Sequence, residues 1–284
     1  MPRLTSFYVI GHPLGHSMSP YIHKRLFSIR NFPAEYFAKD IAPQNLEKEF
    51  NDLLKASGGI NVTIPYKQAV IPLLDGLCGR AELYRSVNTV KISSDGCYGY
   101  NTDADGFLST LRDRDVPLKG RVALIGCGGV GRTFACEAAL AGCTIVNAVR
   151  NQDIESAKQL KSYVESIVSD VDYSITTTDA LAGDFDLLIN ATPVGMYPNC
   201  DKMPVNAGVV KSASAVFDAV YNPADTLLLK TAKANGVKAL GGMPMLVWQA
   251  VAAQKIWNDA VFNPDDINQL IEDASADMCR RFSK

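Results

Sequence analysis

The sequence has no long apolar run and no excess of either charge. None of its apolar stretches approaches the roughly 18 to 20 residues that a helix needs to cross a bilayer. Lysine and arginine number 28 and aspartate and glutamate number 30, so the formal net charge is −2. This balance gives no general electrostatic attraction to nucleic acid or to an anionic membrane. We therefore expect neither a membrane protein nor a nucleic-acid-binding protein.

The cysteines and histidines lack the spacing of a structural site. The seven cysteines are odd in number and contain no C-x-x-C, which argues against a disulfide framework and a zinc knuckle. His12, His16 and His23 share one segment, but their spacing matches no zinc motif, so we predict no metal site. The N-terminal residues lack the apolar centre and cleavage site of a signal peptide. We expect reduced thiols and a cytoplasmic location.

Apolar stretches ended by glycine or proline alternate with amphipathic stretches at helical spacing. This alternation predicts an α/β fold with parallel sheets and crossover helices. Strands are expected at residues 7–11, 35–41, 59–64, 86–92, 97–100, 121–126, 144–149, 187–190 and 216–218. Helices are expected at residues 19–29, 43–56, 69–74, 130–141, 154–168, 226–234, 245–257 and 265–282.

A glycine-rich stretch joins one of these strands to the next helix. It reads Gly126-Cys127-Gly128-Gly129-Val130-Gly131. In this context G-x-G-x-x-G is typical of a dinucleotide site, because its glycines permit the tight turn, the approach of the pyrophosphate and close packing of helix on strand. The N–H groups at the helix start bind the phosphates. A plain tight turn is the alternative, but strand, spacing and helix together favour the cofactor site.

The end of the following strand bears on the choice between NAD and NADP. Sites for NAD usually place a carboxylate there for the ribose 2′-hydroxyl. Here the sequence reads Asn147-Ala148-Val149-Arg150-Asn151, without a carboxylate. Arg150 supplies planar donors suited to a 2′-phosphate, so NADP is favoured. Asp153 lies slightly later, which leaves NAD use open.

The 284 residues allow two modest domains. One array of strands and helices ends and the next begins near residues 105–118, and the tail from Met245 is helical only. A helical tail without strand partners can return to the first array and leave a ligand cleft between the two. We expect two α/β domains: 1–106 with 243–284 for substrate, and a doubly wound, Rossmann-type parallel domain at 107–242 for the cofactor.

Polar side chains gather where the strands of the first domain are expected to end, and ligands of open parallel sheets bind there. Lys67 and Asp103 form a candidate proton-transfer pair. Asn88 and Gln249 are candidates to recognise hydroxyl groups.

Ordinary explanations exist for each residue taken singly. Ser17 and Ser19 are candidates to bind a carboxylate, but either one also suits the cap of the expected helix. Asp103 suits a turn or a helix cap, and Lys67 suits a surface position. Only the combination distinguishes a site from these local roles.

Eight stretches carry that combination, in order: His16–Pro20, Asn61–Lys67, Val87–Thr89, Asn101–Asp103, Gly126–Gly131, Asn190–Met196, Asp218–Pro223 and Gly242–Ala250. Their content, order and spacing resemble the shikimate dehydrogenase family over nearly the whole chain. The resemblance implies an oxidoreductase of the shikimate pathway, which leads to chorismate and the aromatic amino acids. It would reduce 3-dehydroshikimate to shikimate with NADPH, reversibly, as a monomer or homodimer.

The resemblance also implies roles for individual residues. Lys67 and Asp103 would be catalytic. The substrate would be bound by Ser17, Ser19, Thr63, Asn88, Tyr221 and Gln249. The cofactor would be bound by Gly126, Gly128, Gly129, Val130, Gly131, Arg150, Asn151, Thr192, Pro193, Val194, Met196, Gly242 and Met245. The family's Asn-Arg-Thr triplet for the 2′-phosphate reads Val149-Arg150-Asn151 here.

Two alternatives stay open. A quinate/shikimate or aminoshikimate dehydrogenase that uses NAD would share the motifs. A ligand-sensing regulator of the same fold would share the architecture without turnover. Lys67 and Asp103 are both present, and no basic stripe or appended DNA-binding segment is visible, which favours an enzyme.

Overall fold

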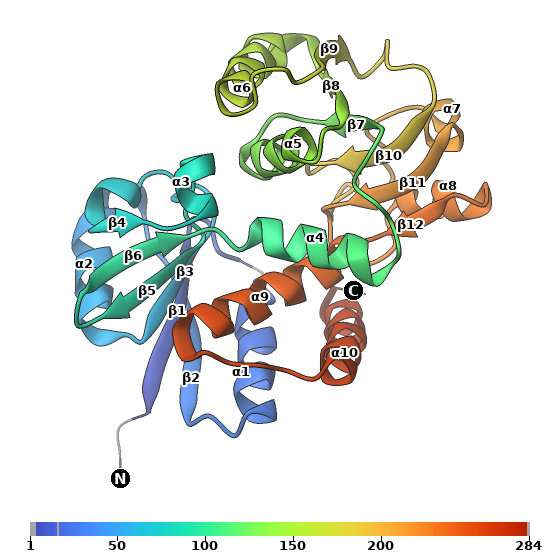
Figure 1. Ribbon diagram of the computed structural model, residues 1–284. Helices are drawn as coiled ribbons and strands as arrows, with labels where there is room; N and C mark the ends of the chain where they lie inside the picture. The colour runs from blue at the N-terminus through green and yellow to red at the C-terminus, as the bar shows by residue number, and fades with distance from the viewer. Residues whose placement is uncertain (1–3, 16, 283–284) are drawn as a thin grey trace. The chain divides into compact units, whose positions relative to one another are not determined.

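The computed structural model describes residues 4–15 and 17–282, and these form two compact units (Figure 1). The first unit contains the residues up to Gly106 and Leu246–Ala274. The second contains Phe107–Met245 and the residues from Ser275 onward. Helix α9 (Gly242–Asn258) and helix α10 (Pro264–Phe282) each begin in one unit and end in the other.

The first unit is built on a six-stranded sheet with the order β2-β1-β3-β5-β6-β4. Its strands are β1 (Thr5–Gly11), β2 (Ala34–Asp40), β3 (Gly59–Val62), β4 (Gly76–Leu77), β5 (Thr89–Ser93) and β6 (Gly96–Tyr100). β1 pairs in parallel with β2 and β3, as predicted. β5 is antiparallel to β3, and it is also antiparallel to β6, to which a tight turn at residues 94–95 joins it. The prediction of parallel strands is therefore wrong for both pairings of β5.

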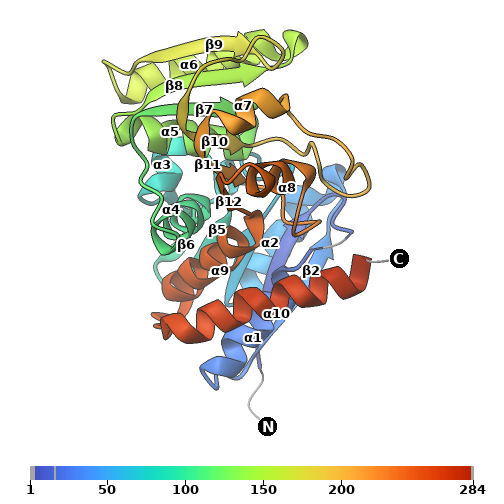
Figure 2. The ribbon, with the colours of Figure 1, turned by 90° about the vertical axis from the view of Figure 1, so that its right-hand side faces the viewer.

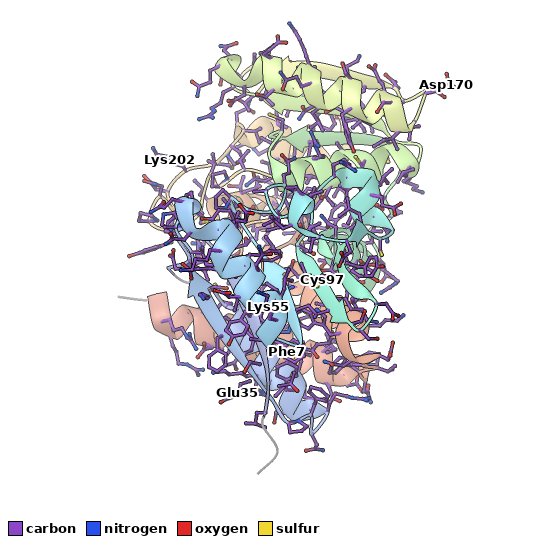
Figure 3. The ribbon with its side chains drawn as sticks, turned by 90° about the vertical axis from the view of Figure 1, so that its left-hand side faces the viewer. Phe7, Glu35, Lys55, Cys97, Asp170 and Lys202 are labelled. Atoms are coloured by element: carbon purple, nitrogen blue, oxygen red, sulfur yellow. The ribbon has the colours of Figure 1, made fainter. Side chains whose placement is uncertain are left out.

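Helices cover both faces of this sheet. They are α1 (Ser19–Ile29), α2 (Leu46–Ala56) after the 3₁₀ turn Pro43–Asn45, α3 (Arg80–Tyr84) and the Leu246–Asn258 part of α9. Successive side chains of β1 point to opposite faces of the sheet. On one face Ile10 packs in a core that includes residues of α2. On the other face Phe7 packs with Phe27 of α1 (Figure 3). Glu35 on the edge strand β2 is exposed. The predicted helix at 69–74 is only a 3₁₀ turn at Ile71–Leu73.

One close contact ties α9 to the sheet. The indole Nε1 of Trp257 donates to the carbonyl of Val90 at 2.9 Å. A Cβ atom at Gly59 would overlap this indole ring. Glycine at the start of β3 therefore lets the helix approach the strand, which fixes the segment that also carries Gln249.

The second unit contains an all-parallel six-stranded sheet with the order β12-β11-β10-β7-β8-β9. Its strands are β7 (Arg121–Ile125), β8 (Thr144–Val149), β9 (Tyr173–Thr177), β10 (Phe185–Asn190), β11 (Ala213–Asp218) and β12 (Lys238–Leu240). The chain runs outward from β7 to β9 and then returns to β10 beside β7. The strand order therefore reverses between β7 and β10, where doubly wound sheets bind ligands.

Helices of this unit pack on opposite faces of its sheet (Figure 2). They are α4 (Asp103–Asp113, from Phe107 onward), α5 (Gly129–Leu140), α6 (Ile154–Ile167), α7 (Ala207–Lys211) and α8 (Leu227–Ala234). Phe107 of α4 and Phe134 of α5 contact Phe217 of β11 edge to face, at centroid distances of 5.0 and 5.5 Å. Val209 of α7 and Leu228 of α8 belong to the other core. This is the predicted doubly wound arrangement.

Two further observations concern the described residues. No helix among them has the length and apolar character to span a bilayer. None of the seven cysteines, which all lie among these residues, forms a disulfide bond.

Candidate active site

Lys67 and Asp103, 36 positions apart, meet in the first unit. Lys67 lies in the turn after β3, and Asp103 is the first residue of α4. The Lys67 Nζ donates to Asp103 Oδ2 at 2.6 Å, and the side chains are 19% and 5% exposed. The carbonyl of Lys67 accepts from the backbone N–H of Val87 at 2.7 Å. Both the backbone and the ammonium of Lys67 are thus held in place.

Asn88 contacts the other oxygen of Asp103. Its Oδ1 accepts from the backbone N–H of Thr102 at 2.8 Å, which fixes the orientation of the amide because a backbone N–H only donates. Its Nδ2 therefore donates to Asp103 Oδ1 at 2.8 Å and to Gln249 Oε1 at 3.2 Å. The predicted residues 67, 88, 103 and 249 form one hydrogen-bonded cluster.

The β5–β6 hairpin explains why Asn88 and Asp103 come together. The two strands pair so that residue 88, before β5, lies beside residue 100, at the end of β6: the N–H of Asn88 donates to the carbonyl of Tyr100 at 3.0 Å. Asn101 then donates to the carbonyl of Ser86 and accepts from the N–H of Asp103, both at 3.0 Å. Its side chain thus turns the chain into α4.

Ser17, Ser19 and Thr63 lie at the carboxyl ends of β1 and β3, the edge of the sheet that also holds Lys67. The Oγ of Ser17 accepts from the N–H of Ser19 at 3.2 Å, but the N-cap of α1 is Met18 and makes no side-chain cap bond, so the expected serine cap is wrong. Thr63 donates its backbone N–H to the carbonyl of Ile10 at 2.9 Å. His16, which belongs to the same motif, lies outside the described residues.

Asp40 holds the loop before these serines and was missed by the sequence analysis. Its carboxylate accepts from the N–H of Leu14 at 2.7 Å and bonds His12 Nδ1 at 2.6 Å. Those two hydrogen bonds, the His12 bond foremost, lower the pKa of Asp40. No motif marks Asp40, which is simply the last residue of an edge strand.

The glycine-rich turn lies at the carboxyl end of β7 and leads into α5, as predicted. Gly126 has φ of +97°, and a Cβ there would lie 2.7 Å from Thr192 Cγ2. A Cβ on Gly131 would lie 3.2 Å from the carbonyl oxygen of Gly126. At Gly128 and Gly129 it would meet no atom within 4 Å. The fold therefore leaves little room for a side chain at Gly126 and Gly131, whereas the space beside Gly128 and Gly129 is open to a ligand.

The comparisons with known proteins agree with this geometry. A family model described as the shikimate dehydrogenase substrate binding domain matches residues 9–90. A crystal structure of shikimate dehydrogenase in complex with NADP⁺ matches with a TM-score of 0.87 and 33% identity, over 95% of each chain. The Thermus thermophilus enzyme, in complex with NADP(H) and shikimate, matches with a TM-score of 0.83 and 30% identity, over 95% of this chain and 100% of that one.

A curated sequence relative decides the family. Shikimate dehydrogenase (NADP(+)) from Caldanaerobacter subterraneus subsp. tengcongensis is 38% identical over 269 residues, which cover 93% of this chain and 95% of the relative. This protein belongs to the shikimate dehydrogenase family. The remaining predicted residues of this family member lie in its second unit.

Arg150 and Asn151 of this shikimate dehydrogenase family member follow β8 and are exposed. The Arg150 side chain is 69% exposed, and its Nε donates to Asp153 Oδ2 at 2.6 Å. The guanidinium predicted to bind a 2′-phosphate thus already contacts a carboxylate. The sequence analysis noted Asp153 close to Arg150 but did not predict an ion pair between them.

The loop 192–196 follows β10, beside the glycine-rich turn. Thr192 Oγ1 donates to Asn190 Oδ1 at 2.6 Å and accepts from the N–H of Val194 at 3.2 Å. Pro193 and Met196 follow in the same loop, and the Met196 side chain is exposed. Thr192, Val194 and their neighbours thus lie at the same sheet edge as the glycine-rich turn.

Three predicted residues lie further along the second unit. Tyr221 follows β11 and is half-buried, and burial raises its pKa. Gly242 and Met245 lie in the first turn of α9, and a Cβ on Gly242 would overlap the carbonyl oxygen of Ala219. Tyr221 is therefore the one predicted substrate residue that lies in a different unit from the rest.

His23, one of the three clustered histidines, is a buried core residue. Its ring stacks on Tyr36 at a centroid distance of 4.2 Å, and its Nδ1 bonds Gln254 Nε2 at 2.9 Å. Burial lowers its pKa to about 3, so the ring is neutral. Within the described residues, no three His, Cys, Asp or Glu side chains gather to hold a metal ion.

Proposed function

We propose that this protein reduces 3-dehydroshikimate to shikimate with NADPH, reversibly, as its relatives' name indicates. The observation that carries the proposal is the Lys67–Asp103–Asn88 cluster at the carboxyl edge of the first sheet. Ligands of such sheets bind at this edge. We assign the substrate to the first unit and the cofactor to the second.

Charge development explains why this cluster suits the reaction. Hydride that reaches the ketone carbon leaves negative charge on the carbonyl oxygen, and a donor placed there lowers the barrier. The Lys67 ammonium donates that proton during reduction, and the neutral amine accepts it during oxidation. Asp103 orients the ammonium. Asn88, Gln249 and Thr63 bind the ring hydroxyls, and Ser17 and Ser19 bind the carboxylate.

The residues of the second unit fit a dinucleotide. Open space at Gly128 and Gly129 admits the pyrophosphate, and α5 begins with N–H groups that have no carbonyl partner within the helix. Arg150 is exposed for a 2′-phosphate, which favours NADP. The loop 192–196 and the start of α9 line the other half of the cofactor. When bound, NADPH supplies the hydride, and the protein supplies position and the proton.

One assay tests this proposal. Purified protein mixed with shikimate and NADP⁺ should generate NADPH absorbance, with a rate proportional to enzyme concentration. Absence of turnover together with tight binding of shikimate would instead indicate the ligand-sensing regulator.

The Arg150–Asp153 ion pair supports one alternative, a quinate/shikimate or aminoshikimate dehydrogenase that uses NAD. A carboxylate near the end of β8 suits a ribose 2′-hydroxyl. Steady-state rates with shikimate, quinate and aminoshikimate, each with NADP⁺ and NAD⁺, separate the possibilities. Seven cysteines without a disulfide bond support a cytoplasmic location. We propose a monomer or homodimer, which sedimentation velocity distinguishes.

A further inference from the structure

Asp218, the last residue of β11, is a fully buried carboxylate with no part in the proposed reaction. Its Oδ2 accepts from Thr226 Oγ1 at 2.6 Å, and its Oδ1 accepts from the N–H of Val220 at 3.0 Å and from Asn190 Nδ2 at 2.9 Å. Burial raises its pKa, and these three donors oppose the rise. A carboxylate is costly to bury unless its acceptors are all used, so its position calls for an explanation.

The first branch from Asp218 leads to the loop 192–196. Asn190 is the register partner of Asp218 on the neighbouring strand. A carboxylate only accepts, so Asn190 must turn its Nδ2 toward Asp218 and its Oδ1 away. That Oδ1 then accepts from both the N–H and the Oγ1 of Thr192, at 3.0 and 2.6 Å. Asn190 Nδ2 also donates to the carbonyl of Val194 at 3.3 Å, and Thr192 Oγ1 accepts from the N–H of Val194, so Asn190 links Asp218 to the loop at several points.

The second branch leads to the loop after β11, which carries Tyr221. The bond from the N–H of Val220 to Asp218 fixes the chain directly before Tyr221. The two loops are also joined, because the N–H of Tyr197 donates to the carbonyl of Asn222 at 3.0 Å. One buried carboxylate therefore lies beneath both loops.

Thr226 bonds Asp218 and also caps the helix that follows β11. Its hydroxyl donates to Asp218 and accepts from the N–H of Leu229 at 3.3 Å, which caps α8. Gly195, in the loop, has φ of +90°, and a Cβ there would lie 3.7 Å from Thr226 Cβ. The loop thus packs directly on the residue that holds Asp218.

We propose that Asp218 is a positioning residue that acts through Asn190 and Val220: it fixes the loop that carries Tyr221, and it holds loop 192–196 in the geometry needed by the nicotinamide half of the cofactor. This inference rests on the proposed function, which assigns that loop to the nicotinamide. It predicts that the adenosine half, bound at the glycine-rich turn and Arg150, does not depend on Asp218.

The test compares Asp218→Ala with Asp218→Asn. In the alanine variant the amide of Asn190 and the N–H of Val220 lose the acceptor that they share, so both loops can shift and kcat should fall about 10²-fold, as expected for a misplaced reactant. The affinity for NADPH should fall as well, whereas the affinity for adenosine 2′,5′-bisphosphate, measured by calorimetry, should stay unchanged. Asparagine should restore most of the activity, because its Oδ1 accepts from Asn190 and Val220 and the Thr226 hydroxyl can accept from its Nδ2.

A second pair covers the case in which Asp218→Ala does not fold. Thr192→Val removes the hydroxyl that links Asn190 to the loop and keeps the shape, and Thr192→Ser restores it. Thr192→Val should likewise lower the affinity for NADPH and leave the affinity for adenosine 2′,5′-bisphosphate unchanged. The control is Asp186→Asn, since Asp186 accepts from the N–H of Arg121 at 2.8 Å at the opposite end of β10.

The outcomes are distinguishable. Equal losses for NADPH and the bisphosphate in Asp218→Ala, or full activity in Thr192→Val, would overturn the positioning role. A wild-type protein that binds NADPH but never acts on shikimate refutes the proposed function. In that case the difference between the affinities for NADPH and for the bisphosphate still tests the positioning role of Asp218 by itself.

Discussion

The two candidate sites are constructed in different ways. In the first unit, side chains hold one another: Lys67, Asp103 and Asn88 are mostly buried and bonded together. In the second, the backbone of a glycine-rich turn borders open space, and the one charged candidate, Arg150, is 69% exposed. The difference shows that a proton donor needs a fixed position before the ligand arrives, whereas a cofactor site mainly needs room and N–H groups.

Removing the amine of the first site should have the largest effect. Lys67→Ala should lower kcat by roughly 10²- to 10⁴-fold with little change in the KM for shikimate, because the proton donor is lost while the hydroxyl and carboxylate contacts remain. Steady-state kinetics and a thermal melt check the result. Unchanged kcat in a folded variant would remove Lys67 from the mechanism.

Filling the open space of the second site should come next. Gly128 has φ of −74° and ψ of −169°, which alanine adopts, and its Cβ would meet no atom of the protein within 4 Å. Gly128→Ala should therefore leave Tm unchanged yet weaken NADPH binding by about 10- to 100-fold, through overlap with the ligand. Calorimetry and a melt measure both quantities. A fall in Tm without loss of affinity would mean that this glycine serves the fold alone.

Removing the exposed charge should act on one cofactor only. Arg150→Ala should raise the KM for NADPH about 10- to 100-fold, the range for a lost charge-assisted bond, and leave the KM for NADH nearly unchanged. Steady-state titration of both cofactors makes the comparison. Equal effects would show that the 2′-phosphate is recognised elsewhere.

Removing the charge of Asp153, the carboxylate beside Arg150, should have the smallest effect. Asp153→Asn frees Arg150 from an exposed ion pair, so the KM for NADPH should fall by roughly two- to fivefold, and the KM for NADH should not. Glu155→Gln is the matched control, because it removes the same charge from the same helix start, whereas Glu155 contacts Lys158. If both variants shift the KM equally, the cause is net charge rather than the contact.

Local patterns accounted for the second unit better than for the first. Gly126–Gly131 was found because strand, glycine spacing and helix are adjacent in sequence. In the first unit, strand ends placed Lys67 and Asp103 at one edge as a candidate proton-transfer pair, and the resemblance gave that pair its catalytic role. The contact itself depends on the β5–β6 hairpin and on Asn101, which no periodicity specifies.

Elements and residues without a sequence signal were missed. β4 and β12 have two and three residues, too short to show a period, and β9 was also missed, as were α3 and α7. Asp40 works through a loop that follows a different strand. His23 was visible in principle, since it shares the helical face of Ile22 and Leu26, which marks a buried position.

Helix α9 also makes the two units optically different. Both tryptophans of the chain, Trp248 and Trp257, lie in its part that belongs to the first unit. Intrinsic tryptophan emission therefore reports on the unfolding of that unit, whereas far-ultraviolet circular dichroism records both. A denaturation series followed by the two signals reveals directly whether the halves melt together or one after the other.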